Sequence, residues 1–150
     1  MKKLFLLFLL CSSTVCVAQK SAVNVRDVFK TMPDSLTPYL SMNNRLDMLD
    51  FMDAKMKAVV TNSLGGSTEM VFLSDDSLAI KMNEASLLSM KVSQVDTATI
   101  VSLHRTYYTK RNQYETVSQT FNSYWFPLSK PVVASTLLRR DDDVRNLPHF

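Results

Sequence analysis

The sequence predicts an α+β fold, with N-terminal helices packed on one face of an antiparallel β-meander. Apolar residues follow a helical spacing up to about residue 57. Beyond that point they mostly alternate with polar residues, as in strands that bury one face. Short polar turns divide this alternating part into segments of about six residues, the usual length of strands in an antiparallel sheet.

Residues 1–19 have the layout of a cleavable signal peptide. Two lysines precede an apolar run, and small residues lead to a cleavage point near Ala18 and Gln19. The apolar stretch is shorter than the roughly twenty residues that span a bilayer, so a membrane anchor is the weaker alternative. Lipidation is weaker still, because neither Cys11 nor Cys16 follows a small residue. We expect an exported protein, in the periplasm or at the cell surface, with no transmembrane segment after cleavage.

Removal of the leader leaves residues 20–150, which we expect to form a single α+β domain. Its strand-rich part is 57–128, and 139–150 is expected to be a loosely ordered tail. Both cysteines lie in the leader, so the domain would have no disulfide and no thiol nucleophile. The net charge falls from +3 to +1, because 15 basic and 14 acidic residues remain. A nearly neutral surface gives no reason to expect nucleic acid as a partner.

Two helices are predicted before the strands. Asn24–Met32 forms a short helix that ends before Pro33, and residues 45–57 form an amphipathic helix with Asn44 as its N-cap. Strands are predicted over 58–63, 68–73, 77–82, 87–93, 97–108, 113–121 and 123–128. Within them, the buried face of the sheet carries Leu78, Ile80, Leu88 and Met90, and the opposite face carries Lys81 and Lys91.

Residue types that carry common chemistries are scarce. The only glycines, Gly65 and Gly66, are adjacent, which suits a hairpin turn and excludes a glycine-rich phosphate loop. The two histidines, His104 and His149, are 45 residues apart and have no cysteine to complete a zinc site. Aspartates at 47, 50 and 53 fit a solvated helix face, with Asp53 and Lys57 as an ion pair, better than a calcium loop. No catalytic set, metal or cofactor is predicted.

Aromatic residues gather in the last predicted strands, beside basic residues. Sheet aromatics often serve cross-strand packing, but such a cluster can also recognise a partner. We therefore take this region as the candidate binding surface, formed by Arg105, Tyr107, Tyr108, Tyr124 and Trp125.

One stretch resembles a known family. The motif MPDS-x-x-PYL, Met32 to Leu40, followed by NNRLDM-x-DFMD, Asn43 to Asp53, is similar to the start of a family of small exported proteins of Bacteroidales, catalogued as domain of unknown function 3256. The resemblance implies a Gram-negative envelope setting. It supplies no active-site residues.

The function that we expect is a non-enzymatic module that binds another protein or an envelope component. The alternative is a small periplasmic hydrolase, with a site built from His104, a nearby Ser or Tyr, and a carboxylate. The position of His104 within the fold distinguishes these two functions. A deep pocket that holds His104 favours the enzyme, and an open position on the polar face of the sheet favours the binding module.

Overall fold

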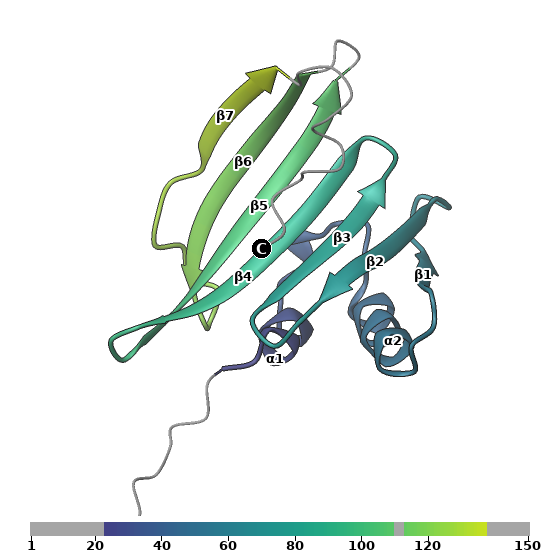
Figure 1. Cartoon of the computed structure of the whole chain (residues 1–150), viewed down its shortest axis with the longest axis horizontal. Coiled ribbons are helices and arrows are strands. Elements are labelled where there is room, and N and C mark those ends of the chain that lie inside the picture. Colours follow the sequence, from purple (N-terminus) through teal and green to yellow (C-terminus); the bar gives the residue numbers. More distant parts are fainter. Residues whose placement is uncertain (1–22, 110–112, 138–150) are drawn as a thin grey trace, which may run out of the picture.

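A computed structural model describes residues 23–109 and 113–137 (Figure 1). The predicted leader, the turn at 110–112 and the predicted tail lie outside the described residues. The described chain begins with two helices and a short 3-10 helix and continues as seven strands: α1 Val25–Lys30, η1 Asp34–Leu36, α2 Met42–Asp53, β1 Ala58–Thr61, β2 Ser67–Leu73, β3 Ser77–Asn83, β4 Ser86–Val95, β5 Ala98–Thr109, β6 Gln113–Asn122 and β7 Val132–Leu137.

The strands form one antiparallel sheet in which every strand pairs with its neighbours in sequence, in the order β1-β2-β3-β4-β5-β6-β7. The predicted meander is thus confirmed, and the first six strands lie within three residues of their expected bounds. Alternation and turn chemistry account for this agreement. At the β1–β2 turn, for example, Gly65 has a φ of +76°, a conformation that other residues adopt with strain.

The prediction of a strand at 123–128 was wrong. The chain turns after Asn122, whose side-chain oxygen accepts hydrogen bonds from the backbone N–H groups of Tyr124 and Phe126, both at 3.0 Å. This turn leaves one isolated bridge, between Phe121 and Pro127. The seventh strand comes later, at β7, which pairs with β6.

The predicted bounds of the second helix were also wrong. Helix α2 begins three residues early because Ser41, rather than Asn44, is its N-cap; the two residues form a capping box instead. The helix ends at Asp53 because Lys55 is in the left-handed conformation, at φ 56°. The N–H of Met56 then bonds the carbonyl of Phe51 at 2.8 Å, which closes the helix in the Schellman pattern.

The early end of α2 also changes an ion pair. Asp53 was expected to pair with Lys57, but its carboxylate lies 2.7 Å from Arg26 of α1, and Lys57 instead approaches Glu69 of β2 at 3.5 Å. The polar face of α2 therefore ties the two helices together rather than pairing within itself.

The core combines side chains of the helices and the sheet. Val28 and Phe29 of α1 and Met48 of α2 belong to the same buried cluster as Ile80 and Leu103 of the sheet. Figure 1 shows both helices near the β1–β4 part of the sheet, away from β6 and β7. Leu78, Ile80, Leu88 and Met90 are buried as expected, while Lys91 is exposed.

None of the helices in the described residues, 23–109 and 113–137, is long and apolar enough to cross a membrane. The longest of them, α2, has only 12 residues and is rich in aspartate.

Candidate functional site

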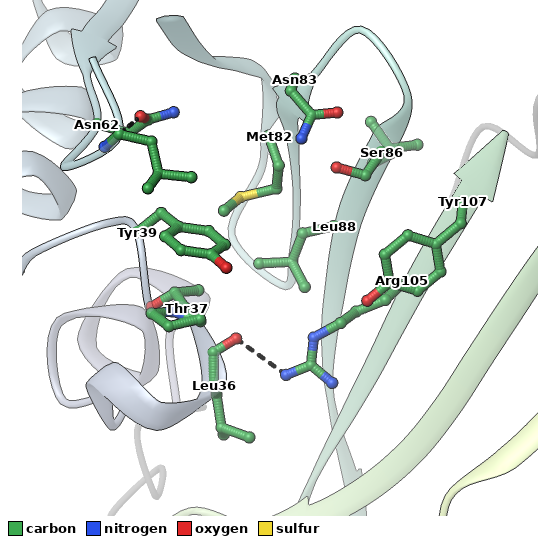
Figure 2. A pocket seen from close by; sticks show the side chains of 13 residues that line it. Leu36, Thr37, Tyr39, Asn62, Met82, Asn83, Ser86, Leu88, Arg105 and Tyr107 are labelled. Carbon is green, nitrogen blue, oxygen red and sulfur yellow. Dashed lines mark hydrogen bonds between the residues drawn. The ribbon is translucent and has the colours of Figure 1, made fainter. Parts of the chain in front are cut away.

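A pocket of about 190 Å³ lies where the loop after α1 meets the sheet (Figure 2). One wall is the loop 36–39. A second is the β1–β2 turn, through Asn62 and Leu64. The floor comes from residues 82–83 and 86–88 and from Arg105 and Tyr107 of β5. Most of the lining is apolar. We call this space the loop–sheet pocket, because segments almost seventy residues apart in sequence meet in it.

Arg45 of α2 holds the loop wall in place. Its side chain is only 2% exposed, and its guanidinium donates to the carbonyls of Met32 and Leu40, at 2.8 and 3.0 Å. It also bonds Thr37 at 3.3 Å and makes a 2.8 Å ion pair with the exposed carboxylate of Asp34. The sequence motif between Met32 and Asp53 thus folds around one buried cation, which fixes the path of the loop that lines the pocket.

Asn62 shapes the second wall. Its side-chain oxygen accepts from the N–H groups of Leu64 and Gly66, at 3.0 and 3.1 Å, and its amide donates to Thr68 at 3.1 Å. The N–H of Ser63 then donates to the carbonyl of Tyr39 at 3.1 Å. This last bond ties the turn to the loop, so the two walls keep a fixed separation.

Arg105 and Tyr107 supply the polar part of the floor. They lie two residues apart on β5, so they share the face that also carries the buried Val101 and Leu103. One guanidinium nitrogen of Arg105 donates to the carbonyl of Leu36 at 2.9 Å. Figure 2 shows this bond and shows the Tyr39 hydroxyl directed into the same space. Arg105 makes no ion pair with any described residue.

The structure therefore brings together two of the five residues that the sequence suggested. Tyr108 lies on the opposite face, across from Tyr114; burial, and then the nearby Tyr114, raise the pKa of its hydroxyl. Tyr124 and Trp125 follow the far end of β6, about seven strand residues or roughly 23 Å from Tyr107.

Trp125 is a core residue rather than a surface residue. It is 8% exposed, its ring contacts Phe121 at a centroid distance of 5.5 Å, and its indole N–H donates to Thr31 at 3.4 Å. Tyr124, by contrast, is 81% exposed. Trp125 thus joins the end of the sheet to the end of α1, and its role is structural.

His104 lies on the face of the sheet opposite the loop–sheet pocket. Its Nδ1 lies 2.7 Å from the hydroxyl of Ser118, its partner in the strand register. Burial lowers the pKa of His104 below its ordinary value. His104 does not line the loop–sheet pocket, and no group of acidic, histidine or cysteine residues in the described chain could hold a metal ion.

Sequence reasoning missed the residues that face Arg105 across the pocket. Tyr39 and Asn62 lie in turns, and no periodicity connects them with β5. A proline before Tyr39 and a glycine pair after Asn62 mark both as turn residues, but the sequence does not show that the two turns meet.

Comparisons with known proteins show the family and the fold. A search of curated proteins gives no match. Among solved structures, the chain is similar to a domain of an uncharacterized protein from Porphyromonas gingivalis W83, with a TM-score of 0.59 and 18% identity. The match covers 70% of this chain and 53% of that one, so the chain spans about half the length of the structure it resembles. The model of a family described as protein of unknown function (DUF3256) matches residues 17–142, and the chain belongs to this family.

Proposed function

We propose that the protein is an exported, non-enzymatic binding module and that the loop–sheet pocket is its binding site. The observation that carries the proposal is the pocket itself. It is a mostly apolar hollow in which a few polar groups, above all Arg105, Tyr39 and Tyr107, converge. Small-molecule and side-chain binding sites have this composition. The partner is an envelope component or a protein that presents a small apolar group.

In this proposal the helices cover one face of the sheet and so create the pocket. The shared core of α1, α2 and the sheet supports this arrangement. The bond from the N–H of Val25 to the carbonyl of Asp75, at 2.9 Å, supports it at the start of α1. With the helices in that position, the loop 36–39 stands over β4 and β5, where the pocket lies.

Export is part of the same proposal. Residues 1–19 have the composition of a leader, and the family match begins at residue 17, so it leaves most of that segment outside. We expect a single domain from residue 20, in the periplasm or at the cell surface. Mass spectrometry of the protein isolated from its native envelope tests this, because cleavage predicts an N-terminus near Gln19. Recovery of the intact leader would contradict it.

The contact between His104 and Ser118 favours a second candidate, a hydrolase. Histidine beside a serine hydroxyl is the core of many nucleophilic sites. Ser118, however, is in the middle of β6, whereas hydrolase nucleophiles of the elbow type sit on a sharp strand-to-helix turn that exposes them. Labelling by a fluorophosphonate that is lost in Ser118→Ala would support the hydrolase, and absence of labelling would end it.

Two adjacent tyrosines provide the test of the binding proposal. Benzyl alcohol and phenylacetate are titrated into the purified protein, and amide NMR shifts map where each of them binds. We expect shifts at 36–39, 82–88 and 105–107, and weaker binding in Tyr107→Ala. Tyr108→Ala is the matched control, because the same side chain is lost one residue away on the other face. Shifts elsewhere, or none with either compound, would refute the proposal.

A further inference from the structure

We infer that the loop–sheet pocket recognises an apolar group that carries a carboxylate, with Arg105 as the residue that binds the acid. This inference rests on the proposed function and narrows it to one ligand chemistry. The ligand is an acid of about one aromatic ring, either free or as the last residue of a peptide chain.

The charge of the pocket is the first argument. Arg105 is the only charged residue among those that line it, and no acidic side chain is present to neutralise it there. Arg105 is partly buried and has no ion pair among the described residues, unlike Arg26 and Arg45, which each contact an aspartate. A cation in such surroundings favours an anionic ligand, because apolar walls strengthen the attraction.

The geometry of the guanidinium is the second argument. The bond to the carbonyl of Leu36 uses one of five N–H donors and fixes the plane of the group. Leu36 is its only hydrogen-bond acceptor among the described residues, so other donors remain for a ligand. A carboxylate matches two parallel N–H groups of arginine, an arrangement that a lysine could not offer. The Tyr39 hydroxyl, directed into the same space, is a further donor (Figure 2).

The size of the pocket is the third argument. A cavity of about 150 Å³ holds a benzene molecule, so a pocket of about 190 Å³ holds one ring or a short branched acyl chain. Leu88 and Met82 line the space beside Arg105 and suit such a group. Apolar volume next to a fixed guanidinium is the combination that an apolar acid requires.

Two ligands of equal shape provide the decisive comparison. Phenylacetate and phenylacetamide differ in charge and have nearly the same volume, so titration of both into the unaltered protein isolates the acid. We expect phenylacetate to bind about tenfold or more tightly, the factor that one charge-assisted hydrogen bond supplies. Equal affinity at the pocket would refute the ligand class and leave the binding proposal standing. Binding of neither compound would refute the ligand class, and the binding proposal would fall with it if benzyl alcohol also failed to bind.

Variants of Arg105 test whether this residue binds the carboxylate of the ligand. Arg105→Gln should abolish the preference for phenylacetate while phenylacetamide still binds. Lys91→Gln, which removes the same charge from an exposed position on β4, should leave the preference unchanged. A preference that survives in folded Arg105→Gln, judged by its unfolding midpoint, would refute the role of Arg105.

Two peptides then separate the sources of the acid. Ala-Ala-Phe is compared with its C-terminal amide and with phenylacetate. Tighter binding of the free peptide than of phenylacetate identifies a peptide C-terminus as the ligand, and the reverse order identifies a small acid. Equal binding of the peptide and its amide, together with no preference for phenylacetate, would overturn the inference.

Discussion

Arg45 allows the clearest test of how the pocket is held together. Replacement by methionine keeps an apolar stem of similar length and removes the guanidinium. The carbonyls of Met32 and Leu40 then lose their donor in a buried setting, as does the hydroxyl of Thr37. Asp34 is exposed and regains water, so the carboxylate itself adds little to the cost.

The expected loss follows from the groups that are left without a partner. A buried carbonyl without a hydrogen bond costs about 1–3 kcal/mol, so the two carbonyls set an upper range of about 2–6 kcal/mol. The variant also avoids desolvating a guanidinium whose Nε is buried without a hydrogen-bond partner, which offsets part of this cost. We expect a net loss of about 2–4 kcal/mol in the free energy of unfolding.

Urea denaturation followed by circular dichroism measures this loss. With a slope of about 2 kcal/mol per M, the midpoint should fall by about 1–2 M. Arg26→Met is the matched control, because it breaks a surface ion pair whose partners are 31% and 59% exposed. Such a pair contributes about 1 kcal/mol at most. If Arg45→Met costs no more than Arg26→Met, the argument that Arg45 holds the loop is wrong.

Three further predictions follow from single positions. Gly65→Ala should cost about 1 kcal/mol in urea denaturation, because φ is +76° there; Gly65→Asn should cost less, and equal costs would contradict the strain argument. Trp125→Ala should cost about 3–5 kcal/mol and Tyr124→Ala less than about 0.5 kcal/mol, and similar midpoints would show that Trp125 is not a core residue. Burial lowers the pKa of His104 in the folded state, so the unfolded chain binds more protons and stability should fall as the pH drops below about 6.5. His104→Gln should reduce that pH dependence of the unfolding midpoint, and an unchanged dependence would assign it to other groups.

The strands could be predicted because each of the first six carries its own local pattern. Leu78 and Ile80 alternate with residues that are small or polar, namely Ser77, Ala79 and Lys81, and turn residues such as Gly65 mark where the alternation stops. The seventh strand has a weaker pattern, since Val132 and Val133 are adjacent and both exposed. This strand forms because its backbone pairs with the free edge of β6. Such pairing depends on the tertiary structure and leaves no pattern in the sequence of the segment.

The errors at α2 and in the site arise where contacts in the folded chain override the usual preferences of single residues. Helix α2 ends at Asp53, and the residue in the left-handed conformation beyond it is Lys55 rather than the usual glycine, so the usual stop signal is absent from the sequence. Arg45 is buried although arginine is mostly exposed. In the site, the alternation along β5 places Tyr107 on the same face as Val101 and Leu103. The partners in the loop could be found only from the folded chain.

The consecutive strand order gives the pocket an unusual dependence on folding. Each strand pairs with its sequence neighbours, so the hairpins can assemble without help from the segment before β1. The pocket beside Arg105 forms only once that segment has docked on the sheet, because Leu36 belongs to the segment and Arg105 belongs to β5. Occupancy and docking are therefore thermodynamically linked. Under the proposed function, a bound ligand would stabilise the docked segment, and undocking of that segment would release the ligand.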